Sequence, residues 1–257
     1  MTQKSNEAPK FNFGSLNLEP ATIQDLGFLS RVKGIPEDTL DVFLPFILKD
    51  LRVTYWNIAF PIRAPEKEEY TGVILNNINY HEIAEGSDVF RSLWIADPFN
   101  CRFFAQKIYI SNSVIEVLSF FDQYKFKFDF KQSVFVSIPE KFHELHFQSL
   151  KNYYPNAAFV SLFGKCLEGK LNDLRLACWV ANKSLDMNTV EEELILNYND
   201  KEIIFNPANL LSFNSFRKAS GLKNVIKVIK PKSDSFNDDL NLHENEPTKK
   251  KSHYSTY

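Results

Sequence analysis

The stretch that decides the fold is Ile108-Tyr109-Ile110-Ser111-Asn112-Ser113-Val114-Ile115-Glu116-Val117-Leu118-Ser119. Residues 108–110 are a short apolar run typical of a buried strand, and residues 114–121 repeat apolar side chains at helical spacing. The same strand–helix order follows twice more along the chain, at 133–138 with 140–152 and at 158–163 with 171–183. Three such units in succession predict an α/β fold with a mainly parallel sheet flanked by helices.

The functional site of such a sheet is expected at one edge. Ligands of open α/β sheets bind beyond the carboxyl ends of the strands. We therefore expect functional residues in the loops that follow the three strands, at 111–113, 138–140 and 163–169.

Residues 18–104 precede this sheet and predict a small α+β region. Apolar residues at helical spacing predict a helix over 21–32, and Pro36 is suited to the start of a second helix that Pro45 ends or kinks. A small antiparallel sheet is predicted from three short runs of strand-type composition, at 56–62, 70–75 and 92–96. The polar residues 1–17 predict a flexible lead-in.

The predicted main domain covers residues 105–230. Asn199-Asp200 lies between two apolar runs and predicts a β-hairpin, and a last helix is predicted over 207–219, where Gly221 ends it. From Pro231 onward strong apolar side chains are few, so 231–257 predicts a disordered tail.

Composition excludes several classes of protein. Thirty Lys and Arg against 32 Asp and Glu give a formal charge of −2, so no global field attracts nucleic acid. Cys101, Cys166 and Cys178 form neither a disulfide framework nor a zinc ribbon, and they favour a reducing cytoplasm. No apolar run is long enough for a membrane helix, so no membrane partner is expected. The 24 phenylalanines predict a large core, and with abundant Asn and Lys they indicate an AT-rich genome.

The three strand–helix units resemble the Toprim domain of primases, topoisomerases and related nucleases, in particular the Toprim-like proteins of bacterial mobile elements. In that family the first strand ends in a glutamate, and a later strand ends in Asp-x-Asp followed by Gly and Lys or Arg. The glutamate position here is Asn112. The Asp-x-Asp positions are Gly164 and Cys166, within Leu162-Phe163-Gly164-Lys165-Cys166-Leu167-Glu168-Gly169-Lys170. The resemblance covers about residues 105–185.

The resemblance implies phosphodiester chemistry, with the glutamate moving a proton and the aspartates holding Mg²⁺. Magnesium prefers hard oxygen ligands. Asn112 is no proton-transfer group near neutral pH, Gly164 offers no ligand, and Cys166 is a soft one. The family's site is therefore degenerate here, and we expect no catalytic residue, metal or cofactor.

Three nearby carboxylates are candidates for a displaced metal site: Glu116, Glu168 and Asp173. Each also has a structural explanation. Glu116 forms a capping-box pattern with Ser113, and the other two suit the positive end of the following helix. If they do hold Mg²⁺, the chain is an active nuclease or primase-type enzyme with shifted acidic residues.

Four lysines are candidates for contact with nucleic acid. Lys165 and Lys170 lie in and after the third loop, while Lys125 and Lys127 alternate with aromatic residues over 124–131. Aromatic stacking with phosphate contact is typical of single-strand binding. The alternation also fits an edge strand with Phe inward and Lys outward, which we favour. His143 and His146, three residues apart, are expected on a solvated helix face.

We therefore expect a non-catalytic Toprim-like protein of the cytoplasm. It would associate with DNA or RNA, and with proteins that replicate or mobilise a mobile element. The alternatives are the active Mg²⁺-dependent enzyme described above and a protein-interaction scaffold without a nucleic-acid role.

Overall fold

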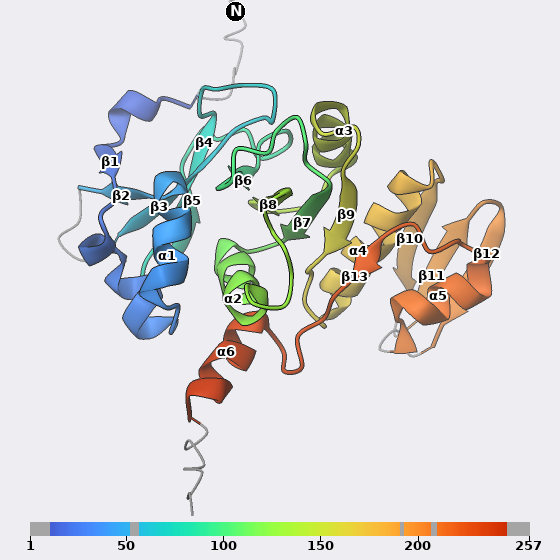
Figure 1. Ribbon diagram of the computed structural model, residues 1–257. Coiled ribbons are helices and arrows are strands. Elements are labelled where there is room, and N and C mark those ends of the chain that lie inside the picture. Colours follow the sequence, from blue (N-terminus) through green and yellow to red (C-terminus); the bar gives the residue numbers. More distant parts are fainter. Residues whose placement is uncertain (1–10, 52–56, 191–192, 207–209, 246–257) are drawn as a thin grey trace, which may run out of the picture.

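The computed structural model of the chain describes residues 11–51, 57–190, 193–206 and 210–245. The structure is mixed α/β, with one central sheet and two antiparallel sheets beside it (Figure 1). The central strands are β6 (Trp94–Ala96), β7 (Lys107–Ser111), β8 (Ser133–Ser137), β9 (Ala158–Ser161) and β13 (Lys227–Val228). Their order is β13-β9-β7-β8-β6, and β6 alone runs antiparallel to its neighbour in this sheet. The prediction of a mainly parallel sheet is thus confirmed.

The three predicted strand–helix units are present. The helices are α2 (Val114–Tyr124) after β7, α3 (Glu144–Tyr153) after β8 and α4 (Leu167–Val180) after β9. α4 begins four residues before its predicted start, so Gly169 and Lys170 lie in its first turns. A Cβ on Gly169 would overlap the Gly164 carbonyl oxygen, so close packing of the turn on the helix requires glycine there.

The N-terminal region contains α1 (Glu37–Phe43) and a five-stranded antiparallel sheet. Its strands, in sheet order, are β1 (Leu18–Pro20), β2 (Leu48–Asp50), β3 (Ile58–Ile62), β4 (Gly72–Asn76) and β5 (His81–Ile83). Pro36 is the N-cap of α1, and the helix ends before Pro45. In place of the single helix predicted over 21–32, a 3-10 turn (Ile23–Leu26) and a π-helix (Phe28–Val32) flank Gly27.

The prediction that 92–96 joins the small antiparallel sheet is wrong. This run forms β6, which pairs with β8 at the edge of the central sheet. Trp94 explains the placement, because its fully buried indole packs on Phe43 and Phe60 and donates a hydrogen bond to the Phe46 carbonyl, 2.9 Å away. β6 therefore joins the N-terminal region to the central sheet.

The C-terminal part adds a three-stranded antiparallel sheet, seen at the right of Figure 1. It consists of β10 (Leu185–Val190), β11 (Glu193–Tyr198) and β12 (Lys201–Phe205), followed by α5 (Phe213–Ser220). Asn199 and Asp200 have φ values of 51° and 64°, as the turn of the predicted hairpin requires. The predicted helix start at 207 lies outside the described residues, and Gly221 ends α5 with a φ of 77°.

The prediction of a disordered tail from residue 231 is wrong as far as residue 245. Residues Phe236–Asn245 form α6, which lies below α2 in Figure 1. Phe236 and Leu240 are one helical turn apart and are 0% and 5% exposed, so one apolar face of the helix is buried in the core. Residues 246–257 lie outside the described part of the chain, as do residues 1–10 of the expected lead-in.

The central sheet separates two cores. Ile108 and Ile110 point into a cluster with α3, α4 and α5, whereas Tyr109 points into a second cluster with α1, α2 and α6. The second cluster is rich in aromatic rings, as the phenylalanine content predicted, with Phe120, Phe130 and Phe135 all packed around Tyr109 or one another. Helices therefore cover both faces of the sheet, which leaves its strand ends and edges as places for a site.

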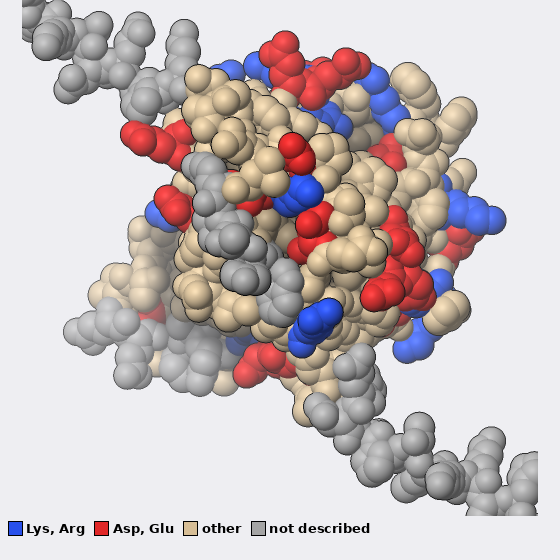
Figure 2. All heavy atoms as spheres, turned by 90° about the vertical axis from the view of Figure 1, so that its left-hand side faces the viewer, with Lys and Arg blue, Asp and Glu red and all other residues tan. Residues whose placement is uncertain are grey.

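Two surface features bear on function. Among the described residues, no helix combines the length and apolar character needed to cross a membrane. The face of the N-terminal region carries acidic and basic side chains interspersed with uncharged ones (Figure 2).

Candidate functional site

The three positions of the Toprim resemblance lie after β7 and β9. Asn112 directly follows β7 and lines a small cavity with Phe60 and Ile74 of the N-terminal sheet. Gly164 and Cys166 lie between β9 and α4. Cys166 is exposed and is the N-cap of α4, where its Sγ accepts a hydrogen bond from the Gly169 amide at 3.4 Å. The thiol thus has a local structural role.

Glu116 does not form the predicted capping box, because the Ser113 side chain makes no cap hydrogen bond. Its carboxylate instead accepts hydrogen bonds from the amides of Phe236 (2.7 Å) and Asn237 (3.3 Å), at the start of α6. The residue therefore caps a helix 120 positions further along the chain. Burial raises the pKa of the Glu116 carboxyl, and these two amide hydrogen bonds oppose the shift.

The sequence suggested that Asp173 lies at the positive end of a helix. In the structure it is instead fully buried, six residues after the start of α4 at Leu167. Its Oδ2 lies 2.6 Å from the Lys230 ammonium, and its Oδ1 accepts a hydrogen bond from Ser161 Oγ at 2.5 Å. Burial raises the pKa of the Asp173 carboxyl and lowers that of the Lys230 ammonium, while the attraction within the pair opposes both shifts.

Lys230 is the residue that the sequence did not reveal. Besides Asp173, its ammonium donates hydrogen bonds to the carbonyl oxygens of Phe163 (2.7 Å) and Gly164 (2.9 Å). It lies 57 residues from Asp173 and two residues beyond β13, and no local pattern marks it.

The candidate carboxylates do not gather into a metal site. Glu168 lies exposed in the first turn of α4, while Glu116 and Asp173 are held by the C-terminal segment. Within the described ranges, no group of three or more His, Cys, Asp or Glu side chains is placed to hold a metal ion.

The residues at this edge do not fit the Mg²⁺ that the resemblance implies. Gly164 supplies a backbone carbonyl where the family has an acidic side chain, and that oxygen already faces the Lys230 ammonium. A positive charge at this point repels a divalent cation. The Cys166 thiol is a soft ligand that a magnesium ion does not select.

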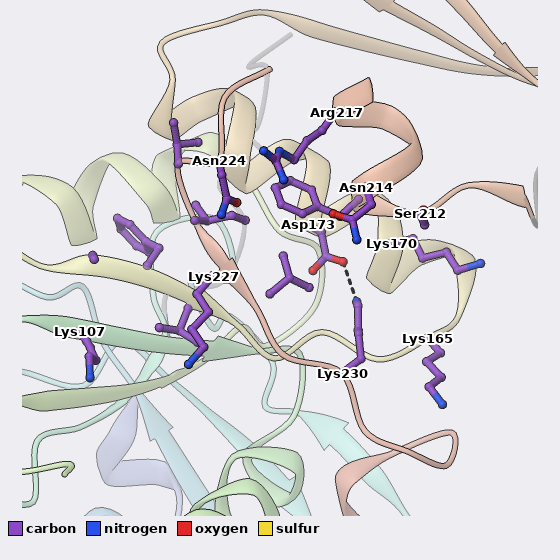
Figure 3. Close-up of a pocket in the computed structure, with 17 residues that line it drawn as sticks. Lys107, Lys165, Lys170, Asp173, Ser212, Asn214, Arg217, Asn224, Lys227 and Lys230 are labelled. Atoms are coloured by element: carbon purple, nitrogen blue, oxygen red, sulfur yellow. Dashed lines mark ion pairs between the residues drawn. The ribbon is translucent and has the colours of Figure 1, made fainter. Parts of the chain in front are cut away.

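A pocket of about 760 Å³ opens along β13, between α4 and α5. Its cationic lining residues are Lys107, Lys165, Lys170, Arg217, Lys227 and Lys230. Among the lining residues in the described part of the chain, Asp173 is the one carboxylate, and it is paired with Lys230. Figure 3 shows this pair, with Arg217 reaching in from α5 and Lys165 and Lys170 on the side of the β9–α4 turn. The pocket therefore suits an anionic ligand.

Of the four lysines predicted to contact nucleic acid, two line the pocket and two do not. Lys165 and Lys170 line the pocket. Lys125 forms ion pairs with Asp38 (2.6 Å) and Asp122 (2.7 Å), so its charge is already neutralised. Lys127 lies with its ammonium 5.1 Å from the centre of the Tyr124 ring. The pocket thus gathers the first two but not the second two.

The alternating segment 124–131 is not an edge strand. It is the end of α2 and the turn after it, with Phe130 buried and Phe126 90% exposed. Phe128 does not line the pocket itself, but its ring contacts a residue that does, because the ammonium of Lys227 lies 4.6 Å from the centre of the ring.

His146 is fully buried, so its placement on a solvated face is wrong. α3 begins four residues later than predicted, with His143 as its N-cap. The His146 Nδ1 accepts a hydrogen bond from the His143 amide, and its Nε2 donates to the Val89 carbonyl. Burial lowers the pKa of His146 to about 4, as befits a neutral core side chain.

Comparison with known proteins finds similarity only to solved structures, and that similarity is weak. No family model matches the chain, and no curated protein matches it. Among solved structures, the primase fragment of the bacteriophage T7 primase-helicase protein aligns with a TM-score of 0.49 at 12% identity, over 95% of this chain and 78% of that one. A structure of the T7 lagging-strand DNA polymerase interacting with primase domains aligns with a TM-score of 0.42 at 12% identity, over 65% and 78% of the two chains. Both TM-scores are below 0.5, and we base no functional conclusion on them.

Proposed function

We propose that this chain is a non-catalytic, nucleic-acid-associated binding module. It would belong to the Toprim-like type and serve DNA replication or mobilisation of a mobile element. The observation that carries the proposal is the pocket along β13, which six cationic side chains line together with one carboxylate, Asp173, that is paired with one of the six, Lys230. Side chains of this kind hold nucleic acid through its phosphates.

Arrangement within the pocket supports a polyanion with apolar parts. Lys165 and Lys170 lie on the side of the β9–α4 turn, and Lys107 and Lys227 lie at the other side of the pocket in Figure 3. Phe213 and other apolar side chains also line the pocket. Phosphates would contact the lysines at both sides, and bases or sugars would contact the apolar part of the lining.

The substitutions at the Toprim positions support a binding role without turnover. Asn112, Gly164 and Cys166 replace the three acidic residues on which the family's reaction depends. Glu116 and Asp173, which could have compensated, have partners in the C-terminal segment.

The test is fluorescence anisotropy with a labelled single-stranded oligonucleotide at several salt concentrations. We expect the wild-type protein to bind with an affinity that falls steeply with salt. Lys165→Glu combined with Lys170→Glu should weaken binding by roughly tenfold or more, because two phosphate contacts become repulsive.

The matched control is Lys131→Glu combined with Lys201→Glu. Both side chains are exposed and do not line the pocket, and the change in net charge is the same. If the control weakens binding as much as the pocket variant, the net charge of the protein attracts nucleic acid and the pocket does not bind it specifically. If the wild-type protein binds neither DNA nor RNA, the proposal fails and a protein-interaction scaffold takes its place.

A further inference from the structure

Residues 229–239, here called the C-terminal strap, comprise the connection from β13 to α6 and the first turn of α6. They cross the carboxyl ends of β9 and β7 (Figure 1). The Ile229 amide donates a hydrogen bond to the Ser161 carbonyl at the end of β9. At the other end, the Phe236 amide binds Glu116 on α2, the helix that follows β7. The strap therefore lies over the edge at which the sequence placed the functional loops.

Contacts along the strap hold it in this position. Lys165, from the β9–α4 turn, donates a hydrogen bond to the Lys232 carbonyl. The Asp239 carboxylate accepts hydrogen bonds from the amides of Lys232 and Ser233, both at 2.6 Å, which holds the connecting part of the strap against the first turn of α6. Phe236 is fully buried next to Phe120 of α2.

The Lys230 ammonium lies close to three oxygen atoms, one from α4 and two from the turn between β9 and α4. Asp173 Oδ2 of α4 lies at 2.6 Å, and the carbonyl oxygens of Phe163 and Gly164 lie at 2.7 and 2.9 Å. One carboxylate and two carbonyls are the donor types that a hard metal cation takes in proteins. Here a side chain of the strap supplies the positive charge they require.

A lysine that only lined the pocket would extend its ammonium into solvent. The Lys230 side chain is instead 27% exposed, and its ion-pair partner Asp173 and both of its carbonyl acceptors belong to α4 and the β9–α4 turn. Lys227, three residues earlier, shows the contrast, because its ammonium lies over the Phe128 ring.

We propose that the Lys230 ammonium replaces a metal ion at the carboxyl ends of the central strands. The C-terminal strap places it among the oxygens of Asp173, Phe163 and Gly164, where a divalent cation could otherwise bind. The edge then needs no Mg²⁺ or Mn²⁺ to be stable. This inference does not depend on nucleic-acid binding in the pocket, so either proposal can fail alone.

The decisive variant is Lys230→Ala, followed by thermal unfolding in metal-free buffer and in millimolar Mn²⁺ or Mg²⁺. Loss of the ammonium leaves the Asp173 carboxylate buried without a counter-charge, and Tm should fall by roughly 6–20 °C. A divalent ion can then enter among the three oxygens, and it should restore at least half of the lost Tm. Wild-type Tm should not respond.

Three further variants locate the effect. Lys227→Ala removes a positive charge nearby without touching the oxygens, so it should show no metal response. Lys230→Arg keeps the positive charge and should show none either. Asp173→Asn in the Lys230→Ala background should abolish the rescue. Paramagnetic broadening by Mn²⁺ should affect the amides of Gly164 and Asp173 first in Lys230→Ala.

The proposal is overturned if Mn²⁺ and Mg²⁺ give Lys230→Ala no stability, or if they stabilise the wild-type protein equally. If Lys230→Ala does not fold in metal-free buffer, recovery of the native circular dichroism spectrum in Mn²⁺ becomes the readout. A variant that stays unfolded with the metal would equally overturn it.

Discussion

The carboxylates of Glu116 and Asp173 lie under opposite ends of the C-terminal strap, and each has a different kind of partner. Glu116, on α2, accepts hydrogen bonds from two backbone amides at the start of α6. Asp173, on α4, pairs with the ammonium of Lys230 and accepts a hydrogen bond from Ser161. Burial raises the pKa of both carboxyl groups.

This difference indicates how far the stability of each contact depends on charge. A buried ion pair is sensitive to the loss of one member, because the other is left uncompensated in a poorly solvated place. A carboxylate bound by amides faces neutral dipoles, and an uncharged side chain with an oxygen can replace part of its role. The Asp173 end should therefore be the more fragile of the two.

Asp173→Asn should give the largest effect. The asparagine is nearly the same size, yet it leaves the Lys230 ammonium without its counter-charge, so we expect a loss of about 4 kcal/mol in the free energy of unfolding. Urea unfolding at neutral pH measures it. The double variant Asp173→Asn with Lys230→Met should recover part of the loss. A single-variant loss below about 1 kcal/mol would contradict a buried, charge-dependent end.

Phe236→Ala should come next. The side chain is fully buried against Phe120, and its removal should cost about 3 kcal/mol, at the low end for a buried phenylalanine because a terminal helix can adjust. Leu242→Ala is the matched control on the same helix, since Leu242 is 59% exposed and should change stability little. Equal and negligible losses in the two variants would mean that α6 is not anchored at the strap.

The central sheet could be predicted from the sequence because its signals are local. Apolar runs such as Ile108–Ile110, followed by helical spacing, need no knowledge of distant residues. The same holds for the Asn199-Asp200 turn, whose positive φ values are set by the residues themselves.

Both anchors of the strap escaped prediction because they join residues far apart in the chain. Ser113 and Glu116 have the spacing of a capping box, but amides 120 residues away provide a partner for the carboxylate. Lys230 is one of many lysines in the sequence, and only the fold brings it to Asp173. Low apolar content wrongly suggested disorder in α6, because the few apolar side chains it has include Phe236 and Leu240, which share one buried face.

Glu116→Gln should give the smallest effect, and its dependence on pH tests the direction of the Glu116 pKa shift. Because burial raises the pKa of Glu116 in the folded protein, its contribution is complete below the ordinary carboxyl pKa and declines as pH rises through the raised value. Glutamine does not titrate, so wild type should lose its advantage over the variant from acidic to neutral pH, by about 1 kcal/mol or less. Urea unfolding across this range, with exposed Glu140→Gln as control, measures the slope. An advantage that grows with pH would mean that the two amide hydrogen bonds from α6 outweigh burial and lower the pKa of the Glu116 carboxyl.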